Sequence, residues 1–129
     1  MENASLIILI ALLQYLFFTM RVGINRKTYQ VLPPKVSGNE SWERLFRVQQ
    51  NTMEQLVIFI PSTFLFAFYV SSSWVLLPGV LFILGRQFYS HLYINNPASR
   101  LPGMAITLLA NVILVLGSPV GVISKLVGN

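Results

Sequence analysis

The polar residues between Trp42 and Gln55 are the part of this sequence best suited to holding a charged ligand. On a helix turning 100° per residue, one face within an arc of roughly 80° carries Arg44, Arg47, Asn51 and Glu54. The segment runs without a break into an apolar stretch. Because a charge in a hydrocarbon-facing helix costs several kcal/mol unless it pairs or lines a wet cavity, we expect this face to look into a protein interior.

A second polar face follows further along the chain, where an arc of about 60° carries Arg86, Tyr89 and Tyr93. With Gln55 and Arg100 added, the charged inward groups are four arginines and one glutamate, so the excess charge is positive. Such a set suits an anionic, peptide-like ligand, since arginine binds carboxylates, glutamate binds an ammonium, and amide or phenol groups form hydrogen bonds. The alternative is that these groups pair to hold helices together, with the remaining arginines reaching the headgroups. The set contains four arginines and only one intramembrane acid, and this excess favours the interpretation as a ligand-binding site over the pairing of helices.

The elements that position these residues are predicted to be membrane-spanning helices. The chain of 129 residues is 54% hydrophobic and only 10% charged, and its mean hydropathy is +0.65. Four apolar stretches cover residues 4–20, 48–70, 74–85 extended to 93, and 101–124, close to the ~20 residues that a bilayer-spanning helix needs. These runs lack the period-2 alternation of a membrane barrel. The predicted fold class is therefore an all-α integral membrane protein.

We expect a single domain over residues 1–129, an up-down bundle of four transmembrane helices. The longest connection is predicted over residues 25–41, where Pro33, Pro34 and Gly38 are typical of a loop. Ser41 is the predicted N-cap of the second helix. The first stretch is interpreted as a retained span, because it lacks the basic residues that precede the apolar core of a cleaved signal peptide.

Basic residues set the predicted orientation. They bracket the first and third loops and are absent from the second, so the candidate site should face the cytoplasm, in a bacterial inner membrane or the endoplasmic reticulum. This topology accounts for the net charge of +5 without nucleic acid as a partner. The chain has no cysteine, and His91 is its single histidine, so we expect no metal site. Any sulfur chemistry needs a thiol that a ligand brings.

The motif Glu43-Arg44-x-x-Arg47-x-Gln49-x-Asn51-x-x-Glu54 resembles the signature of the membrane-associated proteins in eicosanoid and glutathione metabolism, the MAPEG family. The resemblance covers the whole chain. It extends to the Arg26-Lys27 pair, to the Arg86-x-x-Tyr89-x-x-x-Tyr93 motif, and to Arg100 at the start of the fourth span.

This resemblance implies a homotrimer that binds glutathione as a cosubstrate between neighbouring protomers, near the cytoplasmic surface. It implies that Arg100 stabilises the glutathione thiolate and that Tyr89 lies near the sulfur. The residues implied to hold the tripeptide are Arg26, Arg47, Asn51, Glu54, Gln55, Arg86 and Tyr93. A thiol with a pKa near ~8.5 is mostly protonated at neutral pH, so a fixed guanidinium beside it favours the nucleophilic anion.

Two positions depart from the family pattern: Gln55 stands where some members have tyrosine, and Lys27 where one member has arginine. We therefore expect a general glutathione transferase acting on lipophilic electrophiles from the membrane lipid, with peroxidase activity as a compatible second reaction, rather than a specialised eicosanoid synthase. Two alternatives remain at this point. One is a non-catalytic lipid-binding scaffold of the same family, and the other is a small multidrug exporter, which also has four short spans and a membrane glutamate.

Overall fold

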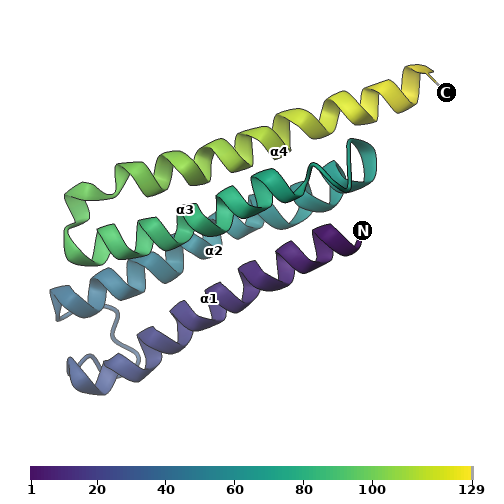
Figure 1. Cartoon of the computed structure of the whole chain (residues 1–129). Helices are drawn as coiled ribbons and strands as arrows, with labels where there is room; N and C mark the ends of the chain where they lie inside the picture. The colour runs from purple at the N-terminus through teal and green to yellow at the C-terminus, as the bar shows by residue number, and fades with distance from the viewer. Residues whose placement is uncertain (129) are drawn as a thin grey trace.

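The computed structural model describes residues 1–128, so Asn129, the last residue of the predicted domain, lies outside the described residues. The chain forms four long helices, α1 (Glu2–Thr28), α2 (Glu40–Tyr69), α3 (Leu76–Asn95) and α4 (Leu101–Gly128), with the short 3₁₀ helix η1 (Pro97–Ser99) before α4. Successive helices run in opposite directions, and both termini lie at the same end of the bundle (Figure 1). The predicted all-α, four-helix, up-down architecture is confirmed.

Three segments are long and apolar enough to cross a membrane by themselves: α1, α2, and the continuous stretch Pro97–Gly128. The remaining long helix, α3, has 20 residues and contains Arg86. Large apolar side chains point outward from the bundle, for example Leu13, Phe68 and Leu116, each more than 60% exposed. This distribution is the one expected of a bundle whose surrounding solvent is lipid.

Two predicted boundaries were wrong. The first loop does not begin at residue 25, because α1 continues to Thr28 with Arg26 and Lys27 in its last turn, where cations interact favourably with the helix dipole. The N-cap of α2 is Asn39, not Ser41: the Asn39 backbone is extended and its side chain accepts a hydrogen bond of 3.0 Å from the Trp42 N–H. Ser41 lies inside the first turn, so it cannot cap the free N–H groups.

The core is built around the facing sides of the helices. The rings of Phe59 in α2 and Phe82 in α3 stack with centroids 3.9 Å apart, and small residues of α1, including Ala4 and Ala11, pack in the same cluster. At the other end of the bundle, the buried indole of Trp42 donates a hydrogen bond of 3.0 Å to the Val22 carbonyl. This bond fixes the start of α2 against α1, next to the polar segment of α2.

Helices α3 and α4 approach each other closely at Gly85 and Gly103. A methyl group added at Gly103 would collide with the backbone of Tyr89, and one added at Gly85 would lie 2.8 Å from the Thr107 hydroxyl. Small residues at a contact allow membrane helices to associate through direct backbone packing. The two glycines therefore place Arg86 and Tyr89 of α3 directly against the first turns of α4.

Candidate active site

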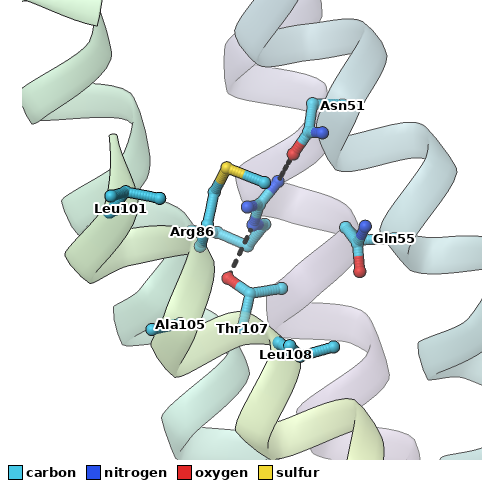
Figure 2. Close-up of a pocket in the computed structure, with 8 residues that line it drawn as sticks. Asn51, Gln55, Arg86, Leu101, Ala105, Thr107 and Leu108 are labelled. Carbon is cyan, nitrogen blue, oxygen red and sulfur yellow. Dashed lines mark hydrogen bonds between the residues drawn. The ribbon is translucent and has the colours of Figure 1, made fainter. Parts of the chain in front are cut away.

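Arg86 is the centre of the polar cluster. Its side chain is only 1% exposed, and its Nε donates a hydrogen bond of 3.1 Å to the Thr107 hydroxyl on α4. Its Nη1 donates to the Asn51 side-chain carbonyl at 2.6 Å (Figure 2) and to the Thr52 hydroxyl at 3.3 Å. The sequence prediction that Arg86 faces the interior is confirmed. One side chain thus joins α2, α3 and α4.

No carboxylate balances the charge of Arg86 among residues 1–128, where the ion pairs are Met1–Glu2 and Arg44–Glu40. The guanidinium instead lies 4.5 Å from the centroid of the Tyr89 ring, within the range of a cation–π contact. Neutral oxygens and one aromatic face therefore hold a buried cation. Such an arrangement leaves a positive potential available to an anionic ligand.

A pocket of about 340 Å³ opens beside this arginine, lined by Asn51, Gln55, Arg86, Leu101, Met104, Ala105, Thr107 and Leu108. Figure 2 shows the amides of Asn51 and Gln55 on one side and the apolar residues of α4 on the other. The polar wall comes from α2 and α3, whereas α4 supplies most of the apolar wall. A pocket with these two walls can hold a polar ligand next to an apolar one.

The orientation of Gln55 is set from α4. The Asn111 side-chain N–H donates a hydrogen bond of 2.9 Å to the Gln55 Oε1. This bond leaves the Gln55 amide N–H₂ for the pocket. Asn111 is only 4% exposed, and its own Oδ1 is buried without a hydrogen-bond partner. An amide at this depth in a helix of a membrane bundle requires a partner, and Gln55 provides it.

Tyr89 and Tyr93 continue the polar wall along α3. Their rings stack with centroids 5.4 Å apart and an interplanar angle of 22°. Tyr89 is buried and Tyr93 is partly exposed. The Tyr89 ring lies 4.5 Å from the Arg86 guanidinium, so this tyrosine lies directly beside the buried cation.

Arg47 and Glu54 lie on the outward side of α2. Both are exposed, and neither forms an ion pair within residues 1–128. They are seven residues apart, so they share one face of the helix. Two charged side chains on the outer face of an apolar helix are costly in lipid unless they pair or reach the headgroups.

The remaining predicted residues have partners elsewhere in the protomer. Arg26 donates to the carbonyls of Val31 at 3.0 Å and Lys35 at 2.7 Å, which fixes the loop between α1 and α2. Arg100 is exposed and donates to the Pro97 carbonyl at 3.1 Å. The protomer thus brings Asn51, Gln55 and Arg86 into one pocket with the tyrosines beside it, and it does not bring Arg26 there.

Arg44, which the helical arc groups with the inward residues, forms an ion pair of 2.7 Å with Glu40. It also donates a hydrogen bond of 3.0 Å to the Ile94 carbonyl at the end of α3. Arg44 therefore joins α2 to α3 near the loop end of the bundle and does not line the pocket.

Sequence reasoning missed three residues of this cluster: Thr52, Thr107 and Asn111. A signal for two of them was present. Gly103, Thr107 and Asn111 recur every four residues in an otherwise apolar helix, a spacing that places them on one face. Polar residues that share a face of a membrane helix usually look toward other helices.

Comparison with known proteins agrees with this architecture. The MAPEG family model matches residues 4–118. The uncharacterized protein sll1147 of Synechocystis sp. is 38% identical over 122 residues, covering 95% of this chain and 89% of that protein.

Two further relatives have named activities. Microsomal glutathione S-transferase 2 of Bos taurus is 32% identical, with 87% of this chain and 77% of the relative covered. Leukotriene C4 synthase of Rattus norvegicus is 28% identical, with 78% and 69% covered. The family match spans most of the chain and agrees with its long apolar helices, so this chain is an integral, multi-pass membrane protein that belongs to the MAPEG family.

Proposed function

We propose that this protein is a membrane-embedded glutathione transferase. The observation that carries the proposal is the uncompensated cationic pocket: Arg86 is buried without a carboxylate partner among residues 1–128, and it lines the pocket beside the amides of Asn51 and Gln55. Glutathione has two carboxylates, an ammonium, two amides and a thiol. The relatives named above as glutathione S-transferase 2 and leukotriene C4 synthase support this choice of ligand.

In this proposal the tripeptide extends from the polar wall of the pocket to the outer face of α2, where Arg47 and Glu54 lie. Arg47 and Arg86 favour its carboxylates, Glu54 its ammonium group, and Asn51 and Gln55 its amides. Tyr93 and Arg26 complete the binding set, with Arg26 reaching the ligand from another protomer or after leaving its loop carbonyls. Because each contact is made to a group that is partly withdrawn from water, losing one leaves the other unpaired at a substantial cost.

The reaction proposed for the bound thiol is nucleophilic attack. Arg100 stabilises the thiolate and Tyr89 lies close to the sulfur, so the anion is present at neutral pH. The thiolate sulfur forms a bond to the electrophilic carbon, and the leaving group departs with the bonding electrons. The apolar residues Leu101, Met104 and Leu108 lie on the opposite wall, where a lipophilic electrophile from the bilayer can approach. The proposal includes a peroxidase reaction as a second activity. The same thiolate attacks a peroxide oxygen and breaks the O–O bond, which releases an alcohol and leaves glutathione sulfenic acid, and a second glutathione converts this acid to the disulfide and water.

We propose that the functional unit is a homotrimer, as the family resemblance implies. The exposed pair Arg47 and Glu54 supports the association of protomers, because a neighbouring protomer would remove both charges from lipid. Mass measurement of the detergent complex, corrected for bound detergent, tests the assembly. An active, monodisperse monomer would refute it.

The orientation proposed places the pocket toward the cytoplasm. Seven of the nine basic residues lie in or near the first and third loops, Arg86 lies midway along α3, and Lys125 lies near the opposite end of the bundle. Loops rich in arginine and lysine face the cytoplasm in most multi-pass proteins.

Calorimetry with glutathione tests the binding site. Arg47→Ala or Glu54→Ala should each weaken affinity by about 2–4 kcal/mol, the loss expected when one partner of a desolvated charged pair is removed. Lys125→Ala is the matched control, because it removes an exposed charge at the other end of α4. If both site variants bind glutathione as the wild type does, these residues serve helix association only.

Turnover of a model chloronitroaromatic then separates the enzyme from the scaffold. The transferase proposal requires conjugate formation by the wild type with glutathione and this electrophile. Binding of lipid without any conjugate would replace the proposal by a non-catalytic scaffold of the same family.

A further inference from the structure

The seam between α1 and α3 contains a second intramembrane cation, Arg21. It lies seven residues before the end of α1, roughly 10 Å along the helix axis. Its Nη2 donates a hydrogen bond of 3.0 Å to the hydroxyl of Ser90, which is buried on α3. The guanidinium also lies 4.9 Å from the Phe18 ring centroid and 5.5 Å from that of Phe17. These contacts hold the cation in a fixed position on the seam.

Arg21 has no counter-charge among residues 1–128, where neither of the two ion pairs includes it. Its Nε is buried and unpartnered, and Nη1 has no partner but is not buried. The candidate active site does not use Arg21 either, because no residue of α1 lines that pocket. A cation at this depth that lacks an internal acid calls for an anion from outside the chain.

A hollow of about 330 Å³ lies beside the seam, lined by Leu84, Gln87, Phe88 and His91 of α3. Gln87 connects the hollow to α1, because its Oε1 accepts a hydrogen bond of 3.2 Å from Gln14. Gln14 and Arg21 are two turns apart on the same face of α1. Leu84 and Phe88 lie deeper in the bundle along α3 than His91. The hollow is therefore apolar in its deeper part and polar toward the end of the bundle that carries Arg21.

We propose that the α1–α3 seam binds an anionic phospholipid, with its phosphate on Arg21 and an acyl chain in the hollow along Leu84 and Phe88. Arginine suits this role because its guanidinium matches the geometry of phosphate oxygens. Basic pockets between transmembrane helices near the cytoplasmic surface recognise anionic headgroups in this way. The bound phosphate would supply the charge that the chain lacks, and it would lie away from the candidate active site.

Native mass spectrometry of the delipidated, detergent-purified protein tests the proposal, using phosphatidylglycerol and phosphatidylcholine with identical acyl chains. The wild type should prefer phosphatidylglycerol by about fivefold or more, as one near-surface cation implies. Arg21→Gln should abolish the preference, whereas Arg21→Lys should keep part of it. Lys27→Gln is the matched control, since Lys27 is an exposed cation at the end of the same helix, and its preference should stay at the wild-type value.

A second variant tests the acyl-chain part. Leu84→Trp fills the hollow without touching the cation, so it should weaken the retention of both lipids. Inorganic phosphate at millimolar concentration should not displace phosphatidylglycerol; displacement would show that the site recognises phosphate alone and would overturn the lipid assignment.

Other outcomes would also overturn it. The proposal fails if the wild type and Arg21→Gln show equal lipid preference. It also fails if Arg21→Gln changes the oligomeric mass but leaves lipid retention unchanged, because the seam would then be a contact between protomers. Glutathione affinity should be the same in the wild type and Arg21→Gln. Failure of the lipid site is thereby distinguished from failure of the glutathione site.

Discussion

Asn51 on α2 accepts a hydrogen bond of 2.6 Å from Arg86 on α3, and the same guanidinium bonds Thr107 on α4 at 3.1 Å. Asn51 is therefore held by its carbonyl, which leaves its side-chain N–H₂ for a ligand. The buried arginine acts on the pocket in two ways, by its positive potential and by the orientation that it gives to a neighbouring amide.

This relationship predicts the effect of removing the Thr107 hydroxyl. Thr107→Val keeps the shape of the side chain but leaves the Arg86 Nε without its acceptor. We expect a loss of about 1–3 kcal/mol in unfolding free energy, the cost of leaving a buried charged donor unsatisfied. Thermal unfolding in detergent measures it.

Two further variants control this experiment. Thr107→Ser should recover most of the stability. Ser118→Ala removes another buried α4 hydroxyl, whose best bond is to the backbone carbonyl of Leu114 at 2.6 Å, and it should cost less. Equal losses in Thr107→Val and Ser118→Ala would show that the bond to Arg86 contributes nothing particular.

The close approach of α3 and α4 gives a prediction for Gly103. Gly103→Ala places a methyl group against the Tyr89 backbone, so the helices must separate or shift, at a cost of about 1–3 kcal/mol. The matched control is Gly23→Ala in α1, where an added methyl group meets no atom within 4 Å. That substitution should be neutral or slightly stabilising, because alanine favours a helix more than glycine does.

The melting temperature should therefore fall in Gly103→Ala and stay at the wild-type value or rise slightly in Gly23→Ala. If both glycine variants unfold at the wild-type temperature, the α3–α4 contact tolerates the extra volume and the two glycines are not required for it.

The helices and their order followed from the sequence, because long apolar runs and the loop composition around Pro33 and Gly38 leave few alternatives. The end of α1 did not, since Arg21, Asn25 and Arg26 are polar and hydropathy alone excludes them. They remain helical because Arg21 bonds Ser90 across the seam, and because the Asn25 side chain donates a hydrogen bond of 2.8 Å to the Arg21 carbonyl. The first contact is tertiary and the second lies within α1, and a count of apolar residues shows neither.

The candidate site was predictable where charge marks it and less so where it depends on neutral groups. Arg86 stood out as an arginine in an apolar segment. Thr52 carries no such mark in the sequence, and the spacing of Thr107 indicates only the face on which it lies, so their distances to the guanidinium are what identify both threonines as its partners. Asn111 is intermediate, because its four-residue spacing from Thr107 was readable but its partner on another helix was not.

The pair formed by Gln55 and Asn111 predicts energetic coupling between α2 and α4. Asn111→Leu and Gln55→Leu should each destabilise the protein, and the double variant should lose less than the sum. We expect an interaction energy of about 0.5–1.5 kcal/mol, the range found for side-chain hydrogen bonds inside membrane proteins. A double-mutant cycle on unfolding free energy measures it directly.

The same cycle on glutathione affinity tests whether Asn111 positions Gln55 for the ligand. In the Gln55→Leu background, Asn111→Leu should no longer change affinity. An undiminished effect there would mean that Asn111 acts on the pocket by another route.

Arg100 separates the proposed enzyme from a scaffold. It lies one residue after η1, exposed, with a single hydrogen bond to the Pro97 carbonyl, so its guanidinium is free to turn toward a ligand at the mouth of the pocket. If it stabilises the thiolate, Arg100→Ala should raise the pKa of the bound glutathione thiol and lower turnover at neutral pH by about 10²–10³, the loss typical of one preorganised donor. Glutathione affinity should fall less than in Arg47→Ala.

Thiolate absorbance in the ultraviolet, followed against pH without a second substrate, reports the pKa of the bound glutathione thiol directly. The sign is fixed by the charge: removing a cation disfavours the anion, so the titration must move to higher pH. Identical titrations and identical turnover in the wild type and Arg100→Ala would leave Arg100 as a surface residue and remove it from the proposed chemistry.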